Sequence, residues 1–298
     1  MTNQCKGIIL AGGSGTRLYP MTNVTNKHLL PVFDKPMIYY SLTTLMLAGI
    51  REVGLISTPE DIGHFEDLLG DGSKWGMSIE YFTQARPGGL PEAFIIAEQF
   101  ISNHRVCLVL GDNIFYGHGL PSLLQAAAAQ PEGATLFAQS VRDPHRFGVV
   151  RFGPDDQPAE FLEKPVNPPS DQAITGLYFY DSRVVEFARE LLPSARGELE
   201  ISDLNNQYLK IGRVEVVQFG RGMAWLDAGT PESLAVAGQL VQTIETLQNT
   251  RIACPEEVAF RMGLINQVRL QSLVRSMPAS AYREYLEKVM TETPEENA

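Results

Sequence analysis

A glycine-rich segment follows the first apolar run of the chain and could hold phosphate groups. This segment runs from Leu10 to Leu18 and contains Gly12, Gly13, Ser14, Gly15 and Thr16. Glycines allow backbone N–H groups to approach an anion closely. The segment lacks the Gly-Lys-Ser/Thr ending of a P-loop, the Gly-x-Ser-x-Gly of a nucleophile elbow and the register of Gly-x-Gly-x-x-Gly. Taken alone, it fits a tight strand-to-helix turn equally well.

Two cations follow the glycine-rich segment and strengthen the phosphate interpretation. Arg17 and Lys27 are the only Lys or Arg residues between Gly7 and Lys35. An arginine can contact phosphate oxygens with two N–H groups at once, whereas a lysine acts as a point charge. The alternative is that both are solvated surface charges, as most Lys and Arg residues are.

Two aspartates in similar settings could hold a metal ion. Asp112 follows the apolar run 106–110, and Asp227 follows Trp225 and Leu226. If both lie at one edge of a sheet, they would hold Mg²⁺, which combines few carboxylates with substrate phosphates. Either residue could instead serve a turn or cap a helix, which is common for aspartate.

Two further segments carry polar candidates. Lys164 stands between Glu163 and Pro165, and the proline predicts an extended conformation for Lys164 at the rim of a cleft. Gln84 precedes a loop that contains Pro87 and Gly89. Its amide offers a donor and an acceptor, which match the imide edge of a pyrimidine. A charged strand end and a polar loop residue are the simpler interpretations.

Composition excludes several classes of protein. The formal net charge of −11 argues against a nucleic-acid binder. The three cysteines and five histidines have no zinc spacing, and Cys5 and Cys107 are expected in the core. No catalytic Ser/His/Asp or Cys/His set stands out, and no apolar run reaches membrane length. We expect a soluble, cytoplasmic protein with no membrane partner.

Strand and helix patterns alternate in the first 110 residues. Strand-like runs cover 7–11, 53–57, 79–82 and 106–110, and helical patterns cover 36–50, 60–69 and 91–101. Such alternation predicts an α/β fold with a Rossmann-like, mixed but mainly parallel central sheet flanked by helices. Ligands bind at the carboxyl ends of such strands, so the glycine-rich segment and Asp112 should meet there.

The second half of the chain has a different pattern. Strand-like runs cover 134–141, 148–152, 159–162 and 174–180 with little helix between them, which suggests strands over the cleft. Helices are expected at 182–191 and 202–210, and strands at 214–218 and 224–226. A helix should start at Thr230-Pro231, run to about 247 and bury Leu234, Ala237, Leu240, Val241 and Ile244. Another should start at Pro255 and end at Gly263, before a helical tail with an acidic end.

Together these motifs resemble the bacterial glucose-1-phosphate thymidylyltransferases, a branch of the sugar-nucleotide pyrophosphorylases. The matching segments are KGIILAGGSGTRL (6–18), NKHLLPV (26–32), LGDNIFYG (110–117), FLEKP (161–165), TGLYFYD (175–181), RGELEISDLN (196–205) and WLDAGT (225–230). Order and spacing agree from Gly7 to about Gly263. The first segment marks the wider superfamily, and the full set is specific to the thymidylyltransferase branch.

The resemblance implies a reaction and a set of roles. dTTP and glucose 1-phosphate would give dTDP-glucose and pyrophosphate, and the partners would be these substrates and a dTDP-sugar. The implied catalytic residues are Arg17, Lys27 and Lys164. The implied nucleotide-binding residues are Leu10, Gly12, Gly13, Ser14, Gly15, Thr16, Gln84, Pro87, Gly89 and Asp112. The implied sugar-binding residues are Gly148, Glu163, Lys164, Ile174 and Tyr178. Asp112 and Asp227 would hold Mg²⁺.

The resemblance also implies an organisation of the chain. Residues 1–250 would form the nucleotidyltransferase domain with its nucleotide- and sugar-binding parts, and 251–298 a helical C-terminal extension. Members of the family are usually homotetramers with a second, regulatory nucleotide-sugar site, to which 254–263 corresponds. The chain departs from the family pattern at Pro91-Glu92 instead of Ala-Gln, at Phe147 instead of Tyr and at Ala228 instead of Thr.

Three alternatives remain open at this stage. One is a uridylyltransferase or an enzyme for another hexose 1-phosphate, because Glu92 adds a negative charge near the expected base pocket. Another is a Rossmann dehydrogenase, in which Asp34 would stand for the acid that binds a ribose. The last is a nucleotide-sugar sensor that binds without turnover. It is disfavoured by the joint presence of five site residues: Arg17, Lys27, Asp112, Lys164 and Asp227.

Overall fold

The computed structural model describes residues 5–13 and 15–292. Its strands are β1 (Lys6–Leu10), β2 (Pro31–Val32), β3 (Lys35–Pro36), β4 (Glu52–Ser57), β5 (Ser78–Thr83), β6 (Val106–Leu110), β7 (Asn113–Tyr116), β8 (Ala134–Ser140), β9 (Gly148–Phe152), β10 (Pro158–Glu163), β11 (Gln172–Tyr180), β12 (Val214–Gln218) and β13 (Ala224–Asp227). Its α-helices are α1 (Ile38–Leu47), α2 (Ile62–Leu69), α3 (Glu92–Ile96), α4 (Glu98–Ile101), α5 (Leu120–Ala129), α6 (Val184–Glu190), α7 (Ile201–Lys210), α8 (Pro231–Gln248), α9 (Pro255–Arg261), α10 (Gln267–Ser276) and α11 (Ala281–Val289).

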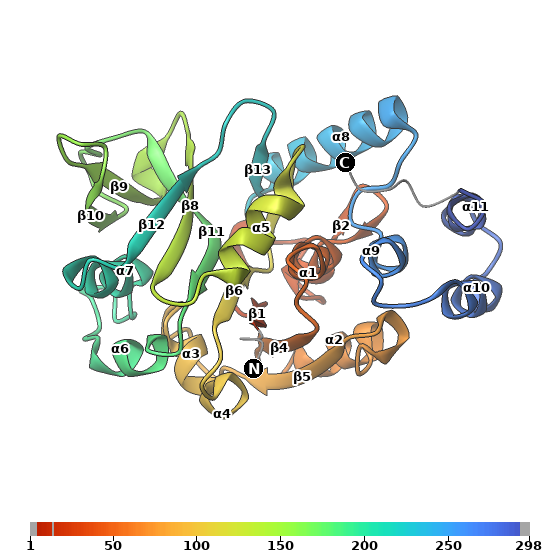
Figure 1. The fold of residues 1–298 in the computed structure, drawn as a ribbon, viewed down its shortest axis with the longest axis horizontal. Coiled ribbons are helices and arrows are strands. Elements are labelled where there is room, and N and C mark those ends of the chain that lie inside the picture. Colours follow the sequence, from red (N-terminus) through yellow and green to blue (C-terminus); the bar gives the residue numbers. More distant parts are fainter. Residues whose placement is uncertain (1–4, 14, 293–298) are drawn as a thin grey trace.

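A nine-stranded mixed sheet forms the centre of the molecule (Figure 1). Its main path is β10-β9-β11-β6-β1-β4-β5, and β8 pairs with both β11 and β12. The ladders between β6, β1, β4 and β5 are parallel, and those of β11 with β6, β8 and β9 are antiparallel. The α/β fold class predicted from the alternating pattern is therefore confirmed.

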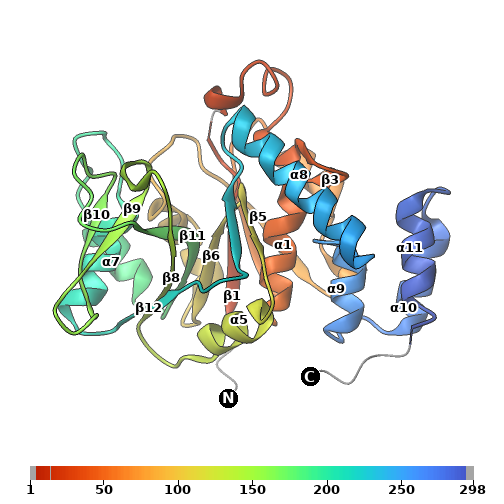
Figure 2. The same ribbon diagram turned by 90° about the horizontal axis from the view of Figure 1, so that it is seen from above.

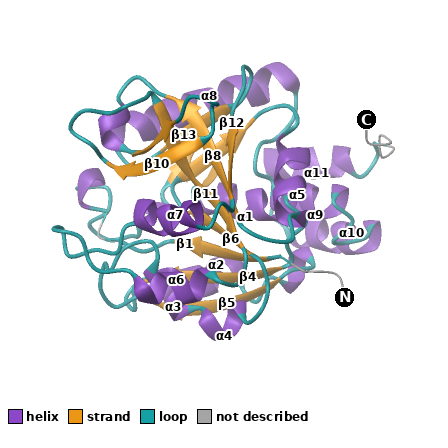
Figure 3. Cartoon of the chain, turned by 60° about the vertical axis from the view of Figure 1, so that its left-hand side comes forward, coloured by secondary structure: helices purple, strands orange, loops and turns teal. Residues whose placement is uncertain are grey.

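Both faces of the sheet are covered by helices, which makes a three-layered molecule (Figure 3). Side chains alternate along β1, so Ile9 packs into one core, and Ile8 and Leu10 pack into the other. The first core includes residues of α1, α2, α5 and the C-terminal helices, and the second includes residues of α3, α6 and α7. The strands are buried on both faces, as expected for parallel strands between helix layers.

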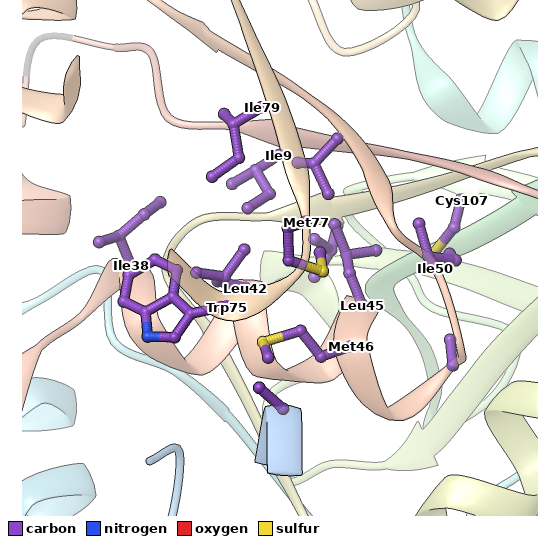
Figure 4. Packing of buried hydrophobic residues seen from close by; sticks show 14 of the residues in the cluster. Ile9, Ile38, Leu42, Leu45, Met46, Ile50, Trp75, Met77, Ile79 and Cys107 are labelled. Atoms are coloured by element: carbon purple, nitrogen blue, oxygen red, sulfur yellow. The ribbon is translucent and has the colours of Figure 1, made fainter. Parts of the chain in front are cut away.

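Helix α1 anchors the first core. Its side chains Ile38, Leu42, Leu45 and Met46 are buried between the helix and the strands, and the Trp75 ring packs beside them (Figure 4). These positions recur at helical spacing, which explains why this segment folds as a helix against the sheet. Packing of α1 in turn supports the strand ends at which the polar candidates lie.

The strand-rich part and the C-terminal helices lie at opposite ends of the molecule. Strands β9 and β10 with α7 are at one end, and α10 and α11 are at the other (Figures 1 and 2). Cys254, Leu270 and Leu286 from the C-terminal helices belong to the same core cluster as α1. The proposed boundary near residue 250 stays a prediction, and the acidic end of the tail, 293–298, lies outside the described residues.

Most predicted elements are present, with some differences. The helix predicted at 91–101 is divided into α3 and α4 at Ala97. Helix α8 begins after the Thr230 cap as predicted, and it buries Ala237 and Val241 but only half-buries Leu234, Leu240 and Ile244. Helix α5 and strand β7 were not predicted from the sequence. Among the described residues, no helix is both long enough and apolar enough to cross a membrane.

Arg105 is a fully buried arginine that stabilises the second half of the sheet. Its guanidinium donates hydrogen bonds to the carbonyl oxygens of Ala127 and Gly133 and to the hydroxyl of Thr135, at 3.0 to 3.2 Å. No carboxylate of a described residue lies within 4.0 Å of it. These three acceptors therefore depend on one side chain.

Replacing Arg105 by alanine is expected to lower the free energy of unfolding by about 3 kcal/mol or more, because buried acceptors lose their donor and a cavity remains. Urea unfolding followed by circular dichroism would measure the change. Arg142→Ala, at an exposed position, is the control and should unfold at the wild-type midpoint. Equal midpoints for Arg105→Ala and the wild type would contradict this role.

Candidate active site

The carboxyl ends of four parallel strands form the edge at which the site lies. Leu10 pairs with Leu110 and Ile56, and Ser57 pairs with Thr83. Backbone hydrogen bonds extend this alignment beyond the strands, since the N–H of Gly111 donates to the Leu10 carbonyl at 3.0 Å. Residues that follow β1, β4, β5 and β6 are therefore adjacent in space, as the sequence predicted.

Two short 3-10 turns after β1 position the cations. Thr16–Leu18 holds Arg17, and Lys27–Leu29 holds Lys27. The second turn is capped by Asn26, whose side chain also donates to the Ala11 carbonyl at 3.3 Å. The turn with Lys27 is thereby attached to the end of β1. Ser14, a candidate phosphate-binding residue, lies outside the described residues.

The guanidinium of Arg17 lies next to Asp227, although the arginine as a whole is exposed. A Cβ atom at Gly229 would be 2.6 Å from a terminal nitrogen of Arg17 and 2.9 Å from Oδ1 of Asp227. Gly229 therefore leaves the space that the guanidinium occupies. The positive charge of Arg17 also lowers the pKa of Asp227, against the larger effect of burial.

Lys27 and Asp112 form a close ion pair. Nζ of Lys27 lies 2.5 Å from Oδ2 of Asp112, which is only 7% exposed. Burial raises the pKa of Asp112, but the charge of Lys27 and the hydrogen bonds of Lys27 and Asn113 outweigh burial and lower it overall. Asp112 is therefore held as a carboxylate.

Asp227 is brought to Asp112 by pairing between β13 and β7. Asp227 is the partner of Asn113 in this antiparallel ladder, and the N–H of Ala228 donates to the Asp112 carbonyl at 2.9 Å. Burial, and then the negative charge of Asp112, raise the pKa of Asp227. Two carboxylates that repel each other in this way suit a divalent cation, which would neutralise both charges.

The described residues near these carboxylates fit Mg²⁺ better than zinc. No group of three or more His, Cys, Asp or Glu side chains forms a metal site within the part of the chain that the structure describes. Two carboxylates leave the remaining coordination positions of a cation to phosphate oxygens and water, as is usual for Mg²⁺. Zinc would require more protein ligands.

A cavity of about 400 Å³ connects the cations and carboxylates to the strand-rich part of the chain. It is lined by predicted site residues from both halves: Arg17, Asp112, Gly148, Glu163, Lys164, Ile174, Tyr178 and Asp227. Lys27 reaches the same place through its ion pair with Asp112. Residues separated by more than 200 positions along the sequence thus surround one space.

The sugar-side candidates are ordered by contacts among themselves. The hydroxyl of Ser202 donates to Oε2 of Glu163 at 2.9 Å, and Nζ of Lys164 lies 3.4 Å from Oε1 of the same carboxylate. A Cβ at Gly148 would be 3.0 Å from Oγ of Ser202, so a larger residue would disturb this arrangement. Ile174 and Tyr178, both buried, form the apolar wall.

The predicted extended conformation of Lys164 is wrong. Its φ is +42°, in the left-handed region, and its N–H donates to the Phe147 carbonyl at 3.1 Å. The preference of a residue before proline for extended backbone is thus overridden by this contact with the loop before β9. A left-handed non-glycine residue is strained, and such strain is typical of functional sites.

The predicted base-binding residues lie farther along the same edge. Gln84 follows β5, is 8% exposed, and its N–H donates to the Ser57 carbonyl at 2.8 Å. Gly89 has φ +99°, and a Cβ there would be 2.1 Å from the Leu199 carbonyl oxygen, so only glycine fits. Pro87 is exposed in the loop between them.

Leu10 is the last residue of β1, and Gly12, Gly13, Gly15 and Thr16 lie in the segment that follows it. The backbone of Gly13 is left-handed, with φ +97°, and no atom would lie within 4 Å of a Cβ built there. This open, exposed backbone fits a segment that approaches a ligand closely. Gly12 faces Oε1 of Gln84, which would be 3.3 Å from a Cβ at this position.

Sequence reasoning missed several residues of the site. Asn113 is 2% exposed and donates to Oδ1 of Asp112 at 3.0 Å, while its own Oδ1 accepts from Gly176 N–H at 3.0 Å and from Trp225 Nε1 at 2.5 Å. It positions the carboxylate and the Trp225 ring together. Arg146, Ser202 and Asn205 line the cavity too. The sequence offered only weak signals for them: Ser202 and Asn205 lie in the matching segment 196–205, and Arg146 precedes Phe147.

Asp34 does not lie where a ribose-binding acid of a dehydrogenase would. It forms ion pairs with Lys35 and Arg251, and Lys35 in turn lies 2.9 Å from Oε1 of Glu245. Asp34 therefore connects the β2–β3 hairpin to the segment after helix α8, while Lys35 connects it to α8 itself. Asp34, the residue on which the dehydrogenase alternative rested, is therefore engaged in ion pairs and does not serve as a ribose-binding acid.

An α/β sheet whose strand ends carry an open glycine segment, two cations and two adjacent carboxylates defines a protein that transfers nucleotidyl groups. The family model described as nucleotidyl transferase matches residues 6–243, and the chain belongs to that family. Within it, the chain is a member of the glucose-1-phosphate thymidylyltransferases, because several relatives of this name are more than half identical to it over nearly their whole length. The resemblance found from the motifs is confirmed.

Two of these relatives come from Neisseria meningitidis and Mycobacterium tuberculosis. The first is 57% identical over 96% of this chain and 99% of its own, and the second 52% identical over 94% and 97%. A solved glucose-1-phosphate thymidylyltransferase from Bacillus anthracis, in complex with sucrose, is 45% identical with a TM-score of 0.73 over 79% of this chain and 94% of its own. A solved UDP-glucose pyrophosphorylase, 24% identical with a TM-score of 0.72, shares the fold.

Proposed function

We propose that this chain joins dTTP to α-D-glucose 1-phosphate and releases pyrophosphate, giving dTDP-glucose. The observation that carries the proposal is one cavity lined by Arg17, Asp112 and Asp227 on one side and by Glu163 and Lys164 on the other. The first set suits a triphosphate, and the second suits a sugar phosphate. High identity to named thymidylyltransferases over nearly the full chain supports the choice of substrates.

The reaction is an in-line displacement at the α-phosphorus of dTTP. A phosphate oxygen of glucose 1-phosphate attacks, the bond to the β-phosphate oxygen breaks, and pyrophosphate leaves with that electron pair. A phosphate monoester has a second pKa of about 6, so the nucleophile is already an anion near neutral pH and no general base is required. The barrier lies in bringing two anions together.

Positive charge from the chain lowers that barrier. Arg17 and Lys27 bind the triphosphate, and Lys164 binds the sugar phosphate from the opposite wall of the cavity. Fixed cations in a partly buried site stabilise developing charge without having to reorient, and positioning of the two substrates contributes much of the remaining rate. Gly12, Gly13, Ser14, Gly15 and Thr16 supply backbone N–H groups to the phosphates.

Asp112 and Asp227 would hold Mg²⁺, whose chemistry here is to neutralise the charge of the triphosphate and orient it. In the structure, the ammonium group of Lys27 also places a positive charge next to Asp112, with Nζ 2.5 Å from Oδ2 of the carboxylate. Lys27 therefore has two roles: it keeps Asp112 ionised, and it lies where phosphate oxygens would approach. Asn113 keeps the carboxylate of Asp112 turned toward this place by its hydrogen bond.

Glucose 1-phosphate is placed against the strand-rich part of the chain. Glu163 accepts hydrogen bonds from sugar hydroxyls, while Gly148 leaves room beside it. Ile174 and Tyr178 give an apolar surface below the sugar ring. Ser202 holds Glu163 in position through its hydrogen bond of 2.9 Å. These contacts select a hexose phosphate by shape and by hydroxyl position.

Pyrophosphate release over a panel of nucleotides and sugar phosphates tests the proposal. dTTP, UTP and dCTP would each be combined with glucose, galactose and mannose 1-phosphate in the presence of Mg²⁺. The pair dTTP and glucose 1-phosphate should give the highest kcat/KM. A higher value for UTP would favour the uridylyltransferase alternative, and nucleotide binding without turnover for any pair would identify a sensor.

The Phe147 ring contributes to the sugar side by packing rather than by hydrogen bonding. Its centroid lies 5.2 Å from that of Trp225, whose position is set by Asn113. Phe147→Tyr, which restores the hydroxyl common in the family, is expected to change kcat/KM for glucose 1-phosphate by less than about threefold. Phe147→Ala should raise the KM for glucose 1-phosphate by about tenfold, because aromatic packing is lost. Steady-state kinetics with varied sugar phosphate would measure both, and a tenfold gain from the tyrosine would refute this view.

Family membership also supports a homotetramer with a regulatory nucleotide-sugar site at 254–263. Both, like the cytoplasmic location, stay predictions. Light scattering of the purified chain and inhibition of turnover by added dTDP-sugar would test the first two.

A further inference from the structure

The side chain of Gln84 is held by two hydrogen-bond acceptors. Its Nε2 lies 2.5 Å from Oε2 of Glu92 and 3.4 Å from the carbonyl oxygen of Gly89. A carboxylate and a backbone carbonyl both accept hydrogen bonds and do not donate them. The amide nitrogen of Gln84 must therefore face Glu92, and the opposite amide orientation would place three oxygens together.

This orientation directs the other end of the amide toward the strand edge. Oε1 of Gln84 faces Gly12, since it would be 3.3 Å from a Cβ there. Among the residues that the structure describes, no donor is hydrogen-bonded to Oε1. Gln84 therefore presents one acceptor to a ligand, and the donor that a freely rotating amide would also offer is engaged by Glu92.

The contact between Glu92 and Gln84 depends on Gly88. A Cβ at Gly88 would lie 2.3 Å from Oε2 and 2.7 Å from Oε1 of Glu92. Glu92 is the first residue of α3 and is half-buried. Among the described residues, no Lys or Arg side-chain nitrogen lies within 4.0 Å of its carboxylate oxygens. Its carboxylate is thus placed beside the glycine loop and bonded to Gln84 rather than to a cation.

We propose that Glu92 is a positioning residue for base selection, acting by fixing the amide orientation of Gln84. The proposal rests on the proposed function, in which Gln84 reads the base of dTTP. An inward-facing Oε1 accepts from the N3–H of thymine or uracil. Cytosine has an acceptor at N3, so the fixed oxygen repels it. Glu92 therefore makes the site choose the imide bases over cytosine.

Selection between dTTP and dCTP tests the proposal, with dUTP as an internal standard. Kinetics with glucose 1-phosphate would be measured for the wild type, Glu92→Ala, Glu92→Gln and Gly88→Ala. In Glu92→Ala the amide can turn over, so the ratio of kcat/KM for dTTP to that for dCTP should fall at least about tenfold. The change should lie in the nucleotide KM, with kcat and the KM for glucose 1-phosphate within about threefold of wild type.

The other variants separate orientation from charge and from folding. Gly88→Ala keeps the carboxylate but displaces it, and it should reproduce the loss of selection. Glu92→Gln can present either end of its amide, so its ratio should fall between those of the wild type and Glu92→Ala. The ratio of dTTP to dUTP should stay unchanged in all three, because the two bases share the N3–H edge. Glu80→Gln, an exposed glutamate on β5, is the control for loss of one negative charge.

The outcomes separate base reading by Gln84 from the positioning role of Glu92. A wild type that uses dTTP and dCTP equally would overturn base reading by Gln84, and this inference with it. A wild type that selects dTTP, together with Glu92→Ala that selects it equally well, would overturn the role of Glu92 alone. A parallel fall of kcat for dTTP, dUTP and dCTP would also contradict it, since that is the effect of a purely structural residue.

Discussion

Replacing Asp112 by asparagine is expected to lower kcat for pyrophosphate release by about 100-fold or more at ordinary Mg²⁺ concentrations. Asparagine keeps the shape of the side chain and can still bond to Asn113, but it removes the charge that pairs with Lys27 at 2.5 Å and lies near Asp227. Loss of one preorganised electrostatic contact commonly reduces kcat by about 10²–10³.

The effect should be specific to charge at this position. Asp155→Asn, at an exposed loop position, is the matched control and should keep wild-type turnover. Thermal unfolding of Asp112→Asn should show a folded protein, since the removed group is a site carboxylate rather than a core side chain. Turnover of Asp112→Asn within about fivefold of wild type would mean that the carboxylate does not contribute to the reaction.

Removal of the Arg17 guanidinium should have an effect of similar size. Arg17→Ala is expected to reduce kcat/KM for dTTP by about 100-fold to 1000-fold, because the triphosphate loses a cation next to Asp227. Arg17→Lys should recover only part of this loss, since lysine restores the charge but not the planar pair of N–H donors. Steady-state kinetics with varied dTTP and saturating glucose 1-phosphate would measure both variants.

A second arginine variant separates this effect from loss of net positive charge. Arg51→Ala changes an exposed arginine between α1 and β4, away from the cavity, and should behave as wild type. If Arg17→Ala matches Arg51→Ala, the guanidinium beside Gly229 does not contact the reacting phosphates, and the assignment of Arg17 fails.

The parts of the site that follow strand ends could be predicted from the sequence. An apolar run followed by glycines or an aspartate identifies a buried strand and its carboxyl end, and parallel pairing brings such ends together. That rule places Gly12, Asp112 and Gln84 on one edge, and the structure bears it out through the register of β1, β4, β5 and β6. Asp227 lies at the same edge for another reason: β13 pairs with β7, a strand that was not predicted from the sequence.

Other features depend on contacts that no local pattern carries. The backbone of Lys164 is set by a hydrogen bond to Phe147, which overrides the preference imposed by Pro165. The orientation of Gln84 depends on Glu92. From the sequence, the charge of Glu92 was expected to lie near the base pocket and to weaken the choice of thymine. In the structure its carboxylate accepts a hydrogen bond from the Gln84 amide. Ala228, noted as a departure, is fully buried beside Val32 and Ile114, where a threonine hydroxyl would add a polar group to an apolar core.

In the proposed reaction, cations and carboxylates far apart in the sequence form one site for the triphosphate and its metal ion. A crystal structure with Mn²⁺ in place of Mg²⁺ and a non-hydrolysable dTTP analogue would locate this site, because Mn²⁺ gives an anomalous signal. We expect a manganese peak shared by Asp112 and Asp227, with the guanidinium of Arg17 on the phosphates. A triphosphate bound elsewhere, or a manganese ion that neither aspartate touches, would contradict it.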